Sequence, residues 1–141
     1  MCIRDRFLIG LDLVKEKTIL EKAYNDTRGI TAQFNLNILT RINSELGGNF
    51  DTHKFAHHAI YNENKSRIEI YLRSLSNQTV VIPKSNLILK IEKDELIHTE
   101  NSHKFTKSQI TEMFGISGFQ INDIWYDQDK HFCLALLSKK D

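Results

Sequence analysis

The stretch "RIEIYLRSLSNQTVVIP", Arg67 to Pro83, decides the fold class. Two short runs rich in β-branched residues flank the turn cluster "SNQ", and the first run alternates polar and apolar side chains. Similar runs follow in "NLILKIEK" and "ELIHTENS", separated by the turn clusters "PKSN" and "EKDE". This pattern predicts an antiparallel meander.

Two helices are expected before the meander. The stronger one covers residues 30–46 and is followed by two glycines, which commonly end helices. Its apolar residues recur every four positions: Ile30, Phe34, Ile38, Ile42 and Leu46. Thr18 and Glu21 have the spacing of a capping box, which predicts a shorter helix that starts at Thr18.

Further strands are expected at both ends of the chain. The apolar run "FLIGLDLV", residues 7–14, is typical of a fully buried strand. A second capping box, Thr106 to Gln109, predicts a helix through about Phe114. Two strands follow it, "FQINDIWYD" and "HFCLALLS", and we expect them to complete a sheet begun by residues 7–14. The fold class is therefore α+β, and we interpret residues 1–6, "MCIRDR", as a non-native leader.

Composition narrows the possible partners. A chain of 141 residues can bury the core of one domain, and a net charge of +1 gives no electrostatic case for nucleic acid or an anionic membrane. No apolar run reaches the roughly 18 residues of a transmembrane helix. Cys2 and Cys133 lie far apart and form no CxxC motif, which favours a reducing cytoplasm.

Several stretches together resemble one family. "AYNDTRGITAQFNLNIL", "RIEIYLRS" and "ELIHTENSHKF" are similar to the C-terminal half of the histidine Nα-methyltransferases of ergothioneine biosynthesis. That resemblance implies a Rossmann-like domain, which binds S-adenosylmethionine, and a smaller domain that closes over L-histidine. Residues 18–105 would form the histidine-binding domain, and residues 7–17 and 106–141 would be the last strands of the methyltransferase sheet.

The same resemblance implies a set of substrate-binding residues. Glu100 and Ser102 would hold the imidazole, Tyr24 the carboxylate, and Ile70 would line the imidazole pocket, with Thr31 as a further member. Residues i and i+2 of a strand lie about 6.5 to 7 Å apart, a span that suits two hydrogen bonds on either side of a ring. A carboxylate accepts a ring N–H, and a hydroxyl can donate or accept.

The expected chemistry is transfer of a methyl group from a sulfonium to a neutral amine. It depends on positioning and requires no metal and no covalent intermediate, and we assign no catalytic residue. The glycine-rich opening of a cofactor domain is not found, so S-adenosylmethionine would be bound mainly by a missing N-terminal half. We therefore expect a truncated enzyme, inactive as this chain alone and monomeric when full length.

Other interpretations stay open. The chain could be a stand-alone α+β module that binds an amino acid or an imidazole without catalysis, or a relative that acts on another amino acid. Asn35 and Asn37 could order the pocket, although a helix-surface position is the simpler interpretation. His53 and His57 have a spacing that could share a metal on a helix, but no Glu lies between them and we assign no metal site.

Overall fold

The computed structural model describes residues 6–140, which form two compact units. The terminal unit holds residues 6–16, 63–66 and 103–140, and the central unit holds Lys17–Asn62 and Arg67–Ser102. Both units combine helices with antiparallel strands, so the α+β class is confirmed.

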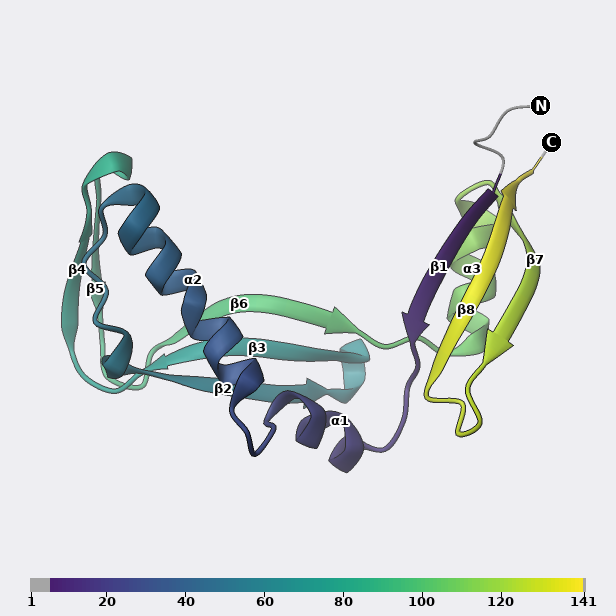
Figure 1. Cartoon of the computed structure of the whole chain (residues 1–141), viewed down its shortest axis with the longest axis horizontal. Coiled ribbons are helices and arrows are strands. Elements are labelled where there is room, and N and C mark those ends of the chain that lie inside the picture. The colour runs from purple at the N-terminus through teal and green to yellow at the C-terminus, as the bar shows by residue number, and fades with distance from the viewer. Residues whose placement is uncertain (1–5, 141) are drawn as a thin grey trace. The chain divides into compact units, whose positions relative to one another are not determined.

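The terminal unit is built on a three-stranded sheet of order β1-β8-β7 (Figure 1). Its strands are β1 (Arg6–Asp12), β7 (Phe119–Tyr126) and β8 (Phe132–Lys139), and both pairings are antiparallel. The expected sheet between residues 7–14 and the last two strands is confirmed. Of the six residues interpreted as a leader, Arg6 pairs with Ser138 in β1, and the other five lie outside the described residues.

One face of this sheet packs on helix α3 (Lys107–Ile116). Thr106 caps α3 in the expected capping box with Gln109. The buried cluster joins residues of β1 and β8, and Leu13 just after β1, to two residues of the helix: Leu11, Leu13, Cys133, Ala135, Leu137, Ile110 and Phe114. Apolar burial of this kind is the main force that holds such a layer together.

The other face of the same sheet is apolar and exposed among the described residues. It carries Leu8, Trp125, Phe132 and Leu134, each of which is 40% exposed or more. The prediction that residues 7–14 form a fully buried strand is therefore wrong for this structure, because only Leu11 and Leu13 of that run are buried.

The central unit contains two small sheets (Figure 1). Strands β2 (Phe55–Asn62), β3 (Arg67–Ser74) and β6 (Leu96–His103) have the order β2-β3-β6. Strand β4 (Gln78–Ile82) pairs with β5 (Leu87–Ile91) in a separate two-stranded sheet. The predicted meander is therefore wrong, since β3 and β4 do not pair. Ser74 explains the difference: its N–H donates to Glu95 at 2.9 Å and its carbonyl accepts from Asp94 at 2.8 Å, which returns the chain to β3 after the hairpin.

Two helices accompany these sheets, α1 (Lys17–Tyr24) and α2 (Ile30–Leu46). The predicted second helix is confirmed, including its end at Gly47, whose φ of 72° suits glycine. The predicted cap at Thr18 is wrong, because α1 begins one residue earlier and the Glu21 carboxylate accepts the Tyr61 N–H at 3.2 Å instead. None of the described helices is long and apolar enough to span a membrane.

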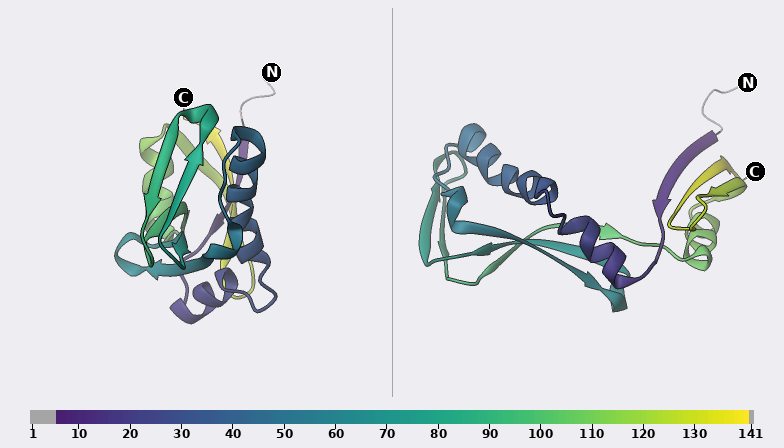
Figure 2. Two further views of the ribbon diagram at one scale, coloured as in Figure 1. Left: turned by 90° about the vertical axis from the view of Figure 1, so that its left-hand side faces the viewer. Right: turned by 60° about the horizontal axis from the view of Figure 1, so that its bottom comes forward.

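The C-terminal end of α2 lies beside the β4–β5 hairpin, as both views of Figure 2 show. Lys84 links them, because its ammonium donates to the Glu45 carbonyl at 2.8 Å. Three short 3₁₀ turns complete the described part of the chain: Thr52–Lys54, Glu63–Lys65 and Pro83–Ser85.

Candidate functional site

An open cavity of about 190 Å³ lies in the central unit between residues of α2 and β6. Its lining combines apolar, amide and charged side chains: Phe34, Asn35, Asn37, Ile38, Arg41, Thr99 and Glu100. Glu100 is the one predicted site residue in this lining. Phe34 is 73% exposed and lines the cavity with Ile38, whereas Ile42 of the same apolar stripe packs against a buried cluster.

A guanidinium also lines the cavity. Arg41 donates to both carboxylate oxygens of Glu45, at 2.9 and 3.3 Å. The hydrogen bonds and the charge of Glu45 raise the pKa of Arg41, so this side chain stays cationic. Sequence reasoning missed Arg41, because an arginine four residues before a glutamate is equally typical of a solvated helix face.

Tyr24 and Ser102 meet at one point of the central unit. The Tyr24 hydroxyl and the Ser102 hydroxyl are 2.6 Å apart, which joins the end of α1 to β6. The family resemblance implies that these two residues bind different ends of the substrate, whereas in the structure their hydroxyls are in direct contact. Their roles toward a ligand stay predictions.

Ile70 lies in the buried cluster against which Tyr24 packs. It is 4% exposed, and its carbonyl accepts the Thr99 hydroxyl at 3.0 Å, which holds β6 beside β3. The cluster contains one residue of α1 and four of β2 and β3: Leu20, Ala59, Tyr61, Ile68 and Ile70. Tyr24 therefore packs against the cluster that contains Ile70, and a contact of Ile70 with an imidazole stays a prediction.

Thr31 lies in the first turn of α2 and is not part of the cavity lining. Its N–H and that of Ile30 each donate to the Asp26 carboxylate at 2.9 Å. These two backbone hydrogen bonds, first from Thr31 and then from Ile30, lower the pKa of Asp26 to about 2. Thr31 thus has a helix-capping environment, and its predicted substrate contact stays a prediction.

Asn35 is only 7% exposed, so the simpler interpretation as a helix-surface residue is wrong for this position. Its amide nitrogen donates to the Tyr71 carbonyl at 2.9 Å and lies 3.0 Å from Nδ1 of His57. The other ring nitrogen of His57 lies 2.8 Å from the Tyr24 carbonyl. His57 belongs to β2 and not to a helix, so it cannot share a metal with His53 in the manner weighed above.

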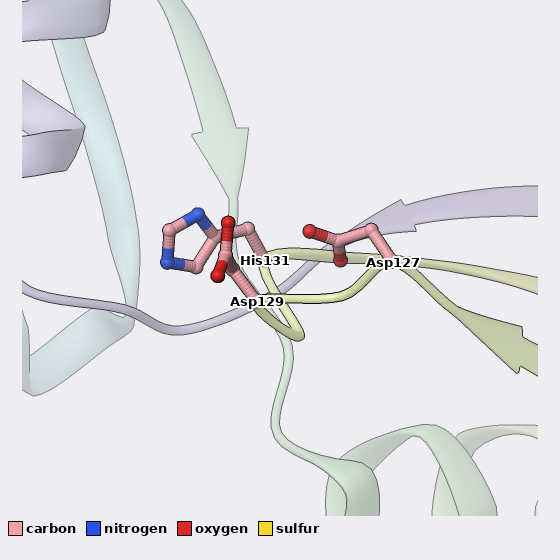
Figure 3. A group of neighbouring side chains, drawn as sticks. All are labelled: Asp127, Asp129 and His131. Atoms are coloured by element: carbon pink, nitrogen blue, oxygen red, sulfur yellow. The ribbon is translucent and has the colours of Figure 1, made fainter.

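Three side chains in the β7–β8 turn could approach a cation: Asp127, Asp129 and His131, whose ligand atoms lie within 4.8 Å of one another (Figure 3). The turn itself accounts for this cluster. The Asp127 carboxylate accepts the Phe132 N–H at 2.7 Å, and this hydrogen bond lowers the pKa of Asp127. Exposed acidic side chains of a tight turn do not define a metal site.

A family model described as "Histidine-specific methyltransferase, SAM-dependent" matches residues 1–139. The chain belongs to this family of methyltransferases. The resemblance found in the sequence motifs is thereby confirmed.

Three relatives show how the family varies. The histidine N-alpha-methyltransferase of Mycobacterium tuberculosis is 37% identical over 96% of this chain. The ergothioneine biosynthesis protein 1 of Schizosaccharomyces pombe is 27% identical over 84%, and an L-tryptophan methyltransferase of Psilocybe serbica is 25% identical over 94%. The chain spans 42% of the length of the Mycobacterium protein, and 15% and 37% of the other two.

Proposed function

We propose that this chain forms the histidine-binding part of an enzyme that transfers methyl groups from S-adenosylmethionine to the α-amine of L-histidine, toward trimethylhistidine. The observation that carries the proposal is the position of Glu100 in the lining of a cavity in the central unit of a histidine-specific family member. A relative named for ergothioneine biosynthesis is consistent with this product.

In this proposal the central unit recognises the substrate. The Glu100 carboxylate accepts an imidazole N–H, and the Ser102 hydroxyl engages the second ring nitrogen. Tyr24 binds the substrate carboxylate, Ile70 shapes the apolar wall and Thr31 completes the site from the start of α2. An amino acid without a ring N–H would offer the Glu100 carboxylate no hydrogen bond in exchange for the water that it displaces, which disfavours its binding.

The chain's contribution to the reaction is positioning. Methyl transfer needs a neutral amine in line with the methyl carbon, and S-adenosylmethionine supplies that methyl group as a sulfonium. The described residues offer no glycine-rich turn between a strand and a helix, so they do not fit the usual cofactor cradle. We therefore assign cofactor binding mainly to sequence outside this chain.

The terminal unit has a separate place in the proposal. We assign β1, β7 and β8 to the last strands of a Rossmann-like methyltransferase sheet, with α3 as a helix that covers one of its faces. The exposed apolar face with Leu8 and Leu134 supports this assignment, because sheets of that class are covered on both faces. A cytoplasmic monomer remains our expectation for the full-length protein.

Methyl transfer can be tested with a chimera. The chain replaces the matching region of the Mycobacterium tuberculosis relative, and methylation of L-histidine and L-tryptophan is followed by mass spectrometry. We expect methylated histidine, no methylated tryptophan, and loss of activity in the Glu100→Ala chimera. Methylation of tryptophan in place of histidine would refute the proposed substrate.

The same chain and chimera also test the alternative, a binding module without catalysis. A chimera that folds and binds L-histidine but transfers no methyl group would favour a module without catalysis. We expect the opposite, a chain without turnover that restores activity when joined to a cofactor-binding partner sequence.

A further inference from the structure

A continuous set of hydrogen bonds leads from α2 to Tyr24. The Asn35 amide nitrogen lies 2.9 Å from the Tyr71 carbonyl and 3.0 Å from Nδ1 of His57. Nε2 of His57 lies 2.8 Å from the Tyr24 carbonyl, and the Tyr24 hydroxyl lies 2.6 Å from Oγ of Ser102. Helix α2, strand β2, helix α1 and strand β6 are therefore joined within the central unit.

The hydrogen-bond donors and acceptors around His57 determine which of its ring nitrogens carries the hydrogen. An amide nitrogen can only donate, and the two hydrogens of Asn35 point to the Tyr71 carbonyl and to His57. Nδ1 of His57 must then accept. A carbonyl can only accept, so Nε2 must carry the hydrogen that it donates to Tyr24.

The Tyr24 carbonyl needs a hydrogen-bond donor from outside its own helix. Tyr24 is the last residue of α1, and the last four carbonyls of a helix have no partner inside it. His57 provides a hydrogen-bond donor for the Tyr24 carbonyl. The side-chain amide of the neighbouring Asn25 donates to the Ala59 carbonyl at 3.0 Å. Both bonds attach the end of α1 to β2, while the Tyr24 ring packs on the cluster around Ile70.

We propose that His57, oriented by Asn35, is a positioning residue that fixes Tyr24 and places its hydroxyl on Ser102 in the substrate site. This inference rests on the proposed function, because it assigns the consequence of the network to binding of L-histidine. It gives two residues a role that the motif resemblance does not assign to them. Neither side chain touches the substrate in this account.

Two substitutions of His57 separate positioning from simple packing. In His57→Gln the side-chain amide nitrogen reaches the place of Nε2 and still donates to Tyr24. In His57→Asn the shorter amide reaches only the place of Nδ1, keeps the contact with Asn35 and loses the donor to Tyr24. Both replacements are polar and similar in size, so a general packing defect would affect them alike.

The experiment uses nuclear magnetic resonance on the whole 141-residue chain. Two-bond proton–nitrogen spectra report the tautomer of His57, and nuclear Overhauser effects between the Tyr24 ring and the Ser102 β-protons report the placement of Tyr24. Titration with L-histidine gives the dissociation constant for the wild type, both His57 variants and Glu100→Ala. Thermal unfolding of each variant records whether it is folded.

We expect the Nε2–H tautomer in the wild type. His57→Gln should keep the Tyr24–Ser102 contact and bind L-histidine within about 2-fold of the wild type. His57→Asn should lose the contact and bind roughly 3- to 10-fold more weakly, as expected for one lost hydrogen bond.

The contrary outcomes are distinct. An Nδ1–H tautomer in the wild type overturns the inference, whether or not a variant folds. The inference is also overturned if His57→Asn keeps both the Tyr24–Ser102 contact and the affinity for L-histidine, while Glu100→Ala weakens the binding of L-histidine. If L-histidine does not bind the wild type but the contact still depends on His57 as described, the substrate assignment fails and the placement of Tyr24 stands.

Discussion

At the scale of single residues, the capping of α2 by Asp26 is a property that pH can test. The Asp26 carboxylate accepts two backbone N–H groups of the first turn, and its pKa falls to about 2 from an ordinary value of 3.8. A carboxylate with a lowered pKa stabilises the folded state above its unfolded pKa, and this contribution is lost as the pH falls through the folded value.

We therefore predict that the Asp26 carboxyl carbon titrates with a midpoint near 2 in the folded chain. Asp26→Ala should remove the contribution of Asp26 to the pH dependence of unfolding between about 4 and 2, and should loosen the turn that holds Thr31. Carboxyl-detected nuclear magnetic resonance and acid unfolding measure both effects. A midpoint at the ordinary value of aspartate would show that the cap is absent in solution.

Single residues also show where sequence reasoning succeeds and where it stops. Family motifs located Glu100, and the structure places it in a cavity. They gave no sign that Asn35 is buried, because an asparagine in a helix is more often exposed, and burial here depends on Tyr71 and His57, which are distant in sequence. Contacts of that kind follow from packing and not from local pattern.

At the scale of elements, the two predicted capping boxes differ. The Thr106 hydroxyl accepts the Gln109 N–H at the start of α3, and the Thr106 N–H donates to the Gln109 side chain in return. Thr18, in contrast, lies inside α1 and is exposed. The local motif is the same in both places. The difference arises because Glu21 is drawn to the Tyr61 N–H, a tertiary contact that the motif cannot contain.

This difference gives a paired prediction. Thr106→Ala should destabilise the chain by about 0.5–2 kcal/mol, since it removes an N-cap hydrogen bond. Thr18→Ala should change the free energy of unfolding by less than about 0.5 kcal/mol, as for an exposed site without such a bond. Chemical denaturation of the two variants measures both values, and an equal loss in both would contradict the assignment of the caps.

The pairing of the strands likewise could not be predicted from local sequence patterns. Alternation and turn clusters located β3 to β6, but the sequence could not show that β4 and β5 leave the sheet as a separate hairpin. Strand pairing is decided by contacts such as those of Ser74 with Asp94 and Glu95, which join residues about twenty positions apart.

At the scale of the whole molecule, the exposed face of the terminal sheet is the feature with the clearest consequence. Leu8 and Leu134 lie on that face with Trp125 and Phe132. Exposed apolar patches and strand edges favour association between chains. The sequence indicated an apolar strand at residues 7–14. It could not show that one face of this strand is buried and the other exposed among the described residues.

We predict that the chain self-associates through this face. The double variant Leu8→Lys and Leu134→Lys should lower the mean mass in sedimentation experiments. Ile88→Lys is the matched control, because Ile88 is 65% exposed on the β4–β5 hairpin and Leu8 is 58% exposed. An equal effect of the control variant would assign the association to general surface hydrophobicity.

The central claim is that Glu100 holds the imidazole of L-histidine. The most direct measurement is the dissociation constant of L-histidine for the wild-type chain and for Glu100→Ala. Glu92→Ala is the control, because Glu92, like Glu100, is an exposed glutamate of the central unit. We predict a loss of about 1.5–3 kcal/mol for Glu100→Ala, as for a hydrogen bond to a charged group, and no change for the control. An unchanged dissociation constant in Glu100→Ala would remove this residue from the site and contradict the account.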